Sequence, residues 1–349
     1  MKFFKISINK TKSIFFILIV LNTVILSTAC SQDSDNNRGE DEYVTLTFSK
    51  NVTGEVNSPI VNEILYYDSS AEKLNKVFES EYTSQYPLGF YDKKNKRVYY
   101  TKNIDIENDL SGDQIFLTDL NNNEEIQLTD SLFAVNNMYA LDDSLFFVAR
   151  PLGSNVLKLG LLDINTGEIL YWGNEDTIED INIEVITVDR KNERIYISAY
   201  SDSERRYNVL HQDGPPGQNN FKMPLHTVYE TDFSFENTRK LFSEHEWIRT
   251  LMTKENYVIA LSDKQYNDAE TPSNLIQYNL LDNSLKKNKW NSSRLQVGDA
   301  NYSLDEENIY AITMVNNKRG MYLYNIKSKK FTEIYAPKTG FLNNIQVVK

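Results

Sequence analysis

The chain of 349 residues is 40% hydrophobic and 12% aromatic, with a formal net charge of −12 and one cysteine. A chain this acidic repels phosphate backbones, so we expect no nucleic-acid partner. One cysteine cannot form an intramolecular disulfide, so the fold must be stabilised by its core. The many Tyr and Phe residues favour half-buried strands over helices.

The first 29 residues have the pattern of an export signal. Their only charges are four lysines, and the apolar run SIFFILIVLNTVIL follows these. The run ends in LSTAC, where small residues precede Cys30, the only cysteine. This ending resembles the lipobox of bacterial lipoproteins, although Ser27 stands where that family usually has an aliphatic residue.

The lipobox resemblance implies cleavage before Cys30, a lipid on its thiol, and anchorage to a cell membrane on the extracytoplasmic side. An uncleaved transmembrane anchor and a plain secretory signal are alternatives. Residues 30–42 are polar and acidic, which predicts a disordered tether. Without the four leader lysines, the remaining chain carries a charge of −16.

From residue 43 onward, a strand-turn-strand pattern such as LGLLDINTGEILYW recurs along the chain. A short polar turn between two further apolar strands precedes most copies, so one unit has four strands, A to D. An Asp or Asn ends each strand C, at Asp68, Asp119, Asp163, Asp232, Asn279 and Asn325. We interpret these residues as structural, because their short side chains can accept hydrogen bonds from turn amides.

The two ends of the repeat region predict how it closes. The first unit lacks its strand A, and a lone strand, GFLNNIQVV, ends the chain. An all-β, six-bladed propeller of four-stranded antiparallel sheets, in which the C-terminal strand completes the first blade, explains both. The pattern resembles TolB-like and WD-related six-bladed propellers. The predicted blades are 43–79 with 339–349, 80–130, 131–173, 174–244, 245–290 and 291–338.

Connections in such a propeller alternate between two faces. The A-B and C-D turns are short and share one face, whereas the B-C and D-A connections share the other. The long B-C connections are predicted at 51–62, 102–112, 151–155, 201–226, 263–273 and 316–319. The longest, 201–226, contains Pro and Gly and is expected to be irregular, either as a flap over the central mouth or as a mobile excursion.

Function is expected on this second face, since variable loops on a rigid scaffold usually carry binding. The candidate binding residues, mostly from D-A connections, are Tyr86, Glu175, Asp176, His245, Trp247, Arg294 and Lys338. Aromatic rings beside mixed charges suit a sugar or a peptide. The alternative is an ordinary ring of charged loops, with Trp247 as the first core residue of its strand.

Several chemistries leave no signature in the sequence. There is no Gly-x-Ser-x-Gly elbow, no Gly-x-Gly-x-x-Gly and no phosphate-binding loop. His211, Asp213 and His226 share the long insertion, but their spacing matches no metal motif. We therefore predict no cofactor and no metal site, and assign no catalytic residue.

These observations favour a lipid-anchored, extracytoplasmic module that binds a protein, a peptide or a glycan. One alternative is a propeller enzyme, such as a glycan hydrolase, lyase or lactonase, with Glu175, Asp176 and Glu246 as candidate acids and bases. Another is an envelope sensor or immunity lipoprotein. The sequence specifies neither an oligomeric state nor a particular membrane.

Overall fold

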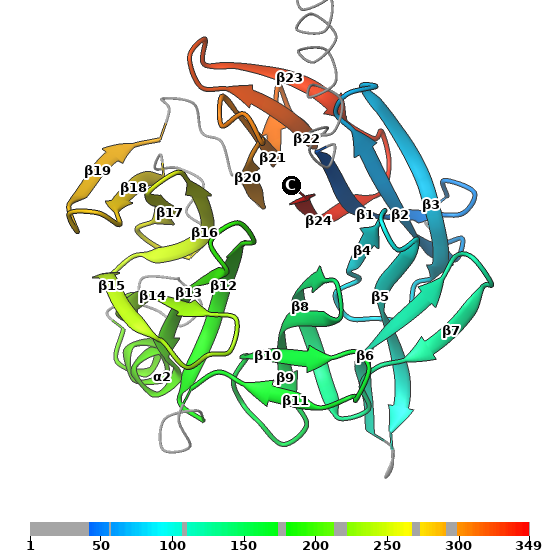
Figure 1. The fold of residues 1–349 in the computed structure, drawn as a ribbon, viewed down its shortest axis with the longest axis horizontal. Coiled ribbons are helices and arrows are strands. Elements are labelled where there is room, and N and C mark those ends of the chain that lie inside the picture. Colours follow the sequence, from blue (N-terminus) through cyan, green and yellow to red (C-terminus); the bar gives the residue numbers. More distant parts are fainter. Residues whose placement is uncertain are drawn as a thin grey trace, which may run out of the picture. The chain divides into compact units, whose positions relative to one another are not determined.

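The computed structural model describes residues 42–55, 57–106, 110–173, 179–212, 222–266, 273–290 and 299–348. Its strands form six four-stranded sheets. Neighbouring strands within each sheet are antiparallel. The sheets stand around a central axis as a six-bladed β-propeller, with β8, β12, β20 and β24 among the innermost strands (Figure 1). The predicted fold class is confirmed.

Each of the first three blades contains four strands, which follow one another from the innermost strand outward. Blade 1 consists of β24 (Phe341–Val348), β1 (Tyr43–Asn51), β2 (Ile60–Asp68) and β3 (Lys73–Glu81). Blade 2 consists of β4 (Gly89–Asp92), β5 (Arg97–Ile106), β6 (Leu110–Asp119) and β7 (Glu124–Gln127). Blade 3 consists of β8 (Leu132–Leu141), β9 (Ser144–Pro151), β10 (Lys158–Asp163) and β11 (Ile169–Tyr171).

The remaining three blades follow in chain order. Blade 4 consists of β12 (Ile181–Asp189), β13 (Arg194–Ser201), β14 (His226–Asp232) and β15 (Arg239–Glu244). Blade 5 consists of β16 (Trp247–Lys254), β17 (Tyr257–Asp263), β18 (Asn274–Asn279) and β19 (Leu285–Lys289). Blade 6 consists of β20 (Ala300–Tyr302), β21 (Asn308–Val315), β22 (Lys318–Asn325) and β23 (Lys330–Tyr335).

The ring is closed by the two ends of the repeat region. Strand β24 pairs antiparallel with β1, from Tyr43 opposite Val348 to Ser49 opposite Phe341. Figure 1 shows the red β24 beside the dark blue β1. This pairing satisfies the inner edge of β1, which would otherwise expose unpaired backbone groups. The predicted completion of blade 1 by the C-terminal strand is confirmed.

The core consists of apolar layers between neighbouring blades, as β9 illustrates. Its Leu145, Phe147 and Ala149 belong to the layer shared with blade 2. The alternate residues Phe146 and Val148 belong to the layer shared with blade 4. Because successive side chains of a strand point to opposite faces, a strand buried on both faces needs a continuous apolar run.

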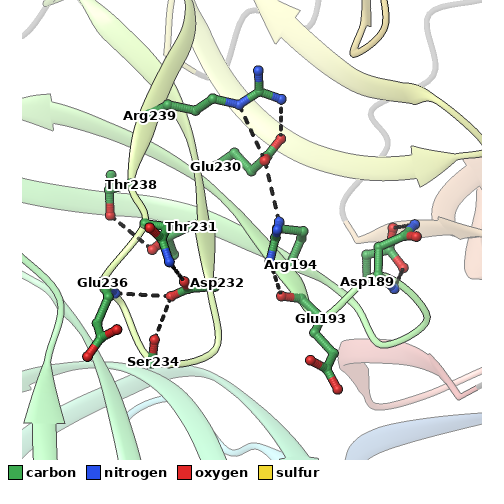
Figure 2. A network of polar contacts seen from close by, with 12 residues as sticks. Asp189, Glu193, Arg194, Glu230, Thr231, Asp232, Ser234, Glu236, Thr238 and Arg239 are labelled. Atoms are coloured by element: carbon green, nitrogen blue, oxygen red, sulfur yellow. Dashed lines mark hydrogen bonds and ion pairs between the residues drawn. The ribbon is translucent and has the colours of Figure 1, made fainter.

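Short turns follow strand C in every blade. The carboxylate or amide oxygen that ends the strand accepts backbone N–H groups two to four residues on, at Asp68, Asp119, Asp163, Asp232, Asn279 and Asn325. Figure 2 shows this turn in blade 4, where Asp232 accepts Ser234 Oγ and the amide of Glu236. The structural interpretation of these residues is confirmed.

We call the surface with the A-B and C-D turns the plain face and the opposite surface the loop face. The longest plain-face turn spans only residues 233–238, whereas a loop-face connection spans 202–225. Two of the predicted long connections, 102–112 and 316–319, were wrong. Strands β5 and β6 occupy most of 102–112, and β21 and β22 are joined by Asn316 and Asn317 alone. Both of these asparagines have positive φ, at 50° and 62°, which suits a tight hairpin.

The long insertion is not irregular throughout, because it begins with helix α2 (Asp202–Leu210). The Ser201 side chain accepts the amide of Glu204 at 3.0 Å and so caps the first turn. Ser201 and Glu204 have the spacing of a capping box, a helix signal present in the sequence. The Pro and Gly residues that suggested irregularity follow the helix.

The predicted leader, Cys30 and most of the tether lie outside the described residues. Residues Glu42–Lys349 form one compact unit. Among the residues described, no helix has the length and apolar character needed to cross a membrane.

Candidate functional site

Four inner strands are distorted near their first residues, where they leave the loop face. Each carries a β-bulge, in which an extra residue interrupts the pairing with strand B. The extra residues are Asn343 in β24, Glu184 in β12, Arg249 in β16, and Phe133 and Asn136 in β8. Bulges re-aim side chains and are common beside functional sites. Three of these bulges place a polar or charged side chain, Asn343, Glu184 or Arg249, near the start of an inner strand.

On the axis, described residues of the inner strands line a small cavity of about 50 Å³. It is lined by inner-strand residues together with Asp299, which directly precedes β20. Its polar lining includes Asn137, Thr187, Asp299 and Gln346. Since one water needs roughly 10–15 Å³ of such space, the cavity suits about three or four waters. This volume is too small to enclose a peptide or a sugar.

On the loop face, Trp247 links blades 4 and 5. Its indole Nε1 donates a hydrogen bond to Glu184 Oε1 at 2.6 Å. Its ring stacks on Tyr266, with ring centres 4.2 Å apart and planes inclined by 14°. Glu184 is the bulged residue of β12, and Tyr266 belongs to the connection between β17 and β18. Three elements therefore bring two aromatic rings and a carboxylate together.

Glu184 is the most unusual acid of this group. Burial raises the pKa of its carboxyl to about 7, while the hydrogen bond from Trp247 and the charge of Arg205 oppose that rise. Within the described part of the chain, no lysine or arginine forms an ion pair with Glu184. A carboxyl whose pKa is shifted by burial is a candidate functional group.

Helix α2 lies beside this group and carries charges of its own. Arg205 and Arg206 pair with the buried Asp202 at 3.4 and 2.6 Å. Asp180 holds the start of the helix by accepting the Ser201 hydroxyl at 2.7 Å and the Ser203 amide at 2.8 Å. The arginines nearest Glu184 in the helix are thus already committed to another carboxylate.

Two large apolar side chains of α2 are exposed. Leu210 is 80% exposed and Tyr207 is 62% exposed. The Tyr207 ring stacks on His211, with centres 4.1 Å apart. Large exposed apolar side chains on a loop-face helix are a feature of interaction surfaces.

A second polar group surrounds β24. Tyr86 donates its hydroxyl to the Asn343 carbonyl at 2.6 Å, and burial raises the pKa of Tyr86. Arg319 lies over the Phe341 ring at 4.2 Å. The Ile345 amide donates to Asp299 Oδ2 at 3.3 Å. These contacts fasten the closing strand to blades 2 and 6.

The predicted binding residues therefore separate into two groups. Trp247 belongs to the Glu184 group, and His245 lies nearby, with its Nδ1 3.1 Å from the Met223 carbonyl. Tyr86 belongs to the β24 group, and Lys338 is exposed in the turn before β24. The other predicted residues, Glu175, Asp176 and Arg294, lie outside the described residues, as does Cys30.

Glu246 and the histidines of the long insertion are the remaining candidates within the described residues. Burial opposes ionisation of Glu246, but hydrogen bonds from Ser262, Asn274 and Lys287 outweigh it and lower the pKa of Glu246. This carboxylate is held ionised, contrary to the expectation of an acid that exchanges protons near neutrality. His226 is buried on β14, whereas His211 is exposed at the end of α2. In the described ranges, no group of three His, Cys, Asp or Glu residues is arranged to bind a metal.

Sequence reasoning missed Glu184, Tyr266 and Asp299. Tyr266 had a usable signal, because it is an aromatic residue inside a predicted loop-face connection. Glu184 had none, since it lies within a predicted strand and only the bulge turns it toward Trp247. Asp299 resembled any other acidic loop residue.

Comparison with known proteins supports the architecture. No family model matches the chain, and no curated protein matches it. A structure titled as a nidogen/laminin complex is similar over 87% of this chain and 98% of its own, with 12% identity and a TM-score of 0.54. TolB from Acinetobacter baumannii is similar over 88% and 67%, with 13% identity and a TM-score of 0.54.

The tricorn protease is a third neighbour, over 81% of this chain and 30% of its own, with 11% identity and a TM-score of 0.51. At these identities the similarities show the fold alone. The protein is thus a six-bladed β-propeller, a class that is commonly used for interactions and supports many functions.

Proposed function

We propose that this protein is a lipid-anchored, extracytoplasmic interaction module that binds a protein or peptide partner through its loop face. The observation that carries the proposal is the difference between the two faces. The plain face has only short turns. The loop face presents α2, the Glu184 group (Glu184, Trp247 and Tyr266) and four bulged inner strands. Loops and helices displayed on a rigid scaffold are typical of binding surfaces.

A protein or peptide is favoured over a glycan by two exposed apolar side chains of α2. Leu210 and Tyr207 are exposed next to the face that carries Trp247. Aromatic and aliphatic side chains of this kind supply the buried centre of a protein interface. The axial cavity of about 50 Å³ is too small to enclose a sugar ring.

Binding is also favoured over catalysis. The enzyme alternative needs carboxylates that exchange protons at the mouth. Glu246 is held ionised by three hydrogen-bonding neighbours. Among the described acids, Glu184 and Asp299 have pKa values raised toward neutrality, and each already accepts a hydrogen bond, from Trp247 and from the Ile345 amide.

The face assignment is tested by capture of envelope proteins on the immobilised full-length protein. We expect a partner that is retained by the wild type and lost with Trp247→Ala or with Tyr207→Ala and Leu210→Ala. The matched control removes apolar side chains from outer strands, with Leu170→Ala and Leu285→Ala, which are 52% and 42% exposed. A partner lost only with the control variants would place binding elsewhere.

Anchorage is tested separately by fractionation. Cys30→Ser should release the protein from the membrane fraction if a lipid on that thiol holds it. Wild-type protein that is found in the membrane with its leader uncleaved would instead indicate a transmembrane anchor.

A further inference from the structure

Glu184, the carboxylate of the Glu184 group, has no ion pair with a described residue. Its Oε1 accepts the Trp247 indole at 2.6 Å, and the described residues offer Glu184 no other hydrogen bond and no ion pair. The side chains that face it are Trp247, Tyr266, Tyr200 and Arg205. A carboxylate removed from water is costly unless a positive charge pairs with it.

Arg205 does not supply that charge directly. Its Nε lies 3.4 Å from Asp202 Oδ1, and Asp202 also pairs with Arg206. The two tyrosines that face Glu184 are neutral, because burial raises the pKa of Tyr200 and of Tyr266. The surroundings of Glu184 therefore contain aromatic surface and one cation, Arg205, that is already paired with Asp202.

Aromatic rings and a carboxylate together select cations. A lysine or arginine side chain placed against the Trp247–Tyr266 stack gains cation–π attraction, and a charge-assisted hydrogen bond to Glu184 Oε2, which no described residue contacts by a hydrogen bond, adds to it. The rest of the protein favours the same ligand charge, since the chain is acidic overall. A neutral sugar would use the ring surface but would leave the carboxylate without a counter-charge.

We propose that Glu184, Trp247 and Tyr266 form a subsite for one lysine or arginine side chain of the partner. This proposal rests on the proposed function and specifies the partner's chemistry. Binding of the cation ionises Glu184, so a proton leaves the carboxyl as the ion pair forms. The complex should thus release protons near neutral pH and weaken as the pH falls below 7.

The test uses tryptophan fluorescence of the full-length protein, because Trp172 and Trp290 are buried at 6% and 8% exposure. The probe is the peptide acetyl-Gly-Ser-Arg-Ser-Gly-amide, and its matched control carries citrulline, which has nearly the same shape but no charge. We expect the arginine peptide to change the emission saturably and the citrulline peptide to bind at least about tenfold more weakly.

The protein variants separate charge from shape. Glu184→Gln keeps the acceptor for Trp247 and should weaken the arginine peptide at least about tenfold. Glu179→Gln is the control, because this carboxylate is 64% exposed and pairs with Lys158. Calorimetry in two buffers of different ionisation enthalpy should show proton release for the wild type and none for Glu184→Gln.

Three results would overturn the subsite. These are equal binding of the arginine and citrulline peptides, unchanged binding by Glu184→Gln, and saturable binding of cellotetraose in place of the arginine peptide. If no peptide binds while the envelope partner is still lost with Trp247→Ala, the subsite is wrong and the proposed function stands. If no peptide binds and no envelope partner depends on Trp247, the face assignment is rejected as well.

Discussion

At the residue scale, His226 shows how burial couples the fold to pH. The imidazole is 1% exposed, its ring lies 4.8 Å from that of Tyr200, and its Nε2 has no hydrogen-bond partner among the described residues. Burial lowers the pKa of His226 to about 3. The folded protein therefore keeps this ring neutral in a pH range where the unfolded chain protonates it.

We expect His226 to cost stability in mild acid. Above the unfolded pKa of about 6.5, His226 does not lower the free energy of unfolding. As the pH falls below that value, the unfolded chain binds a proton that the folded protein excludes, and the free energy of unfolding falls. Between pH 7 and pH 5 the loss is about 2 kcal/mol. Urea unfolding of His226→Gln should lack this part of the pH dependence, whereas the exposed control His211→Gln should retain it. Parallel pH profiles for all three proteins would contradict the assignment.

Asp299 should have the opposite effect on the pH dependence of stability, which falls as the pH rises. Burial raises its pKa to about 6, although the Ile345 amide and Arg319 oppose the rise. Its ionisation therefore destabilises the fold as the pH rises from about 4 to 6. Asp299→Asn retains an acceptor for Ile345 and should raise the free energy of unfolding at pH 8, by at most about 3 kcal/mol.

The Asp299 prediction is checked by urea unfolding at pH 8 and pH 4, where the gain should be present and absent respectively. Asp163→Asn is the control, because turn amides lower the pKa of this exposed carboxylate. Its substitution should give no gain at pH 8. A gain for Asp299→Asn that is equal at both pH values would show that charge is not the cause.

At the element scale, the fold is built from strands whose local patterns agree with their places. Strand β9 is apolar along its length because it contacts a neighbouring blade on each side. Strand β19 is exposed at every residue, and its sequence LKKNK is correspondingly charged. Charge on an outer edge discourages pairing with other sheets.

Helix α2 depends on a single capping residue. A nine-residue helix is marginal without support, so the Ser201 contacts to Glu204 and Asp180 should be important. Ser201→Ala should destabilise α2 by about 1–2 kcal/mol, and amide exchange of residues 202–210 should quicken by about 5- to 30-fold.

Ser328→Ala is the control for Ser201, since Ser328 lies in an exposed turn and contributes its backbone amide to Asn325. Exchange across blade 6 and α2 should be unchanged in this variant. Unchanged exchange in Ser201→Ala would mean that packing on blade 4 holds the helix without the cap.

At the scale of the whole molecule, β24 joins the ends of the chain. Its Leu342, Ile345 and Val347 belong to the layer between blades 6 and 1. Burying each is worth about 1.5–3 kcal/mol, and their sum approaches the net stability of a domain, about 5–15 kcal/mol. Blade 1 also loses its inner strand if β24 is removed.

Deletion of residues 341–349 should therefore abolish the cooperative thermal transition and expose the inner edge of β1. Addition of the peptide FLNNIQVVK should restore the transition, because it supplies the missing strand. Differential scanning calorimetry with a scrambled peptide provides the control. A truncated protein that unfolds at the wild-type temperature would show that the ring does not need this closure.

The sequence by itself determined the number of blades, the closing strand and the turn residues. These features depend on interactions within or between adjacent strands, such as alternation in β9 and the amides bound by Asp232. The prediction of a wholly irregular insertion failed because the later Pro and Gly residues outweighed the capping pattern at Ser201.

Only the tertiary structure decided which loop-face residues meet. Glu184 and Trp247 are 63 residues apart in the chain, yet their side chains share a hydrogen bond. The contact depends on a bulge in β12 and on the packing of blade 4 against blade 5. Local sequence patterns reveal neither the bulge nor the packing, because a bulge shifts a side chain without changing the alternation around it.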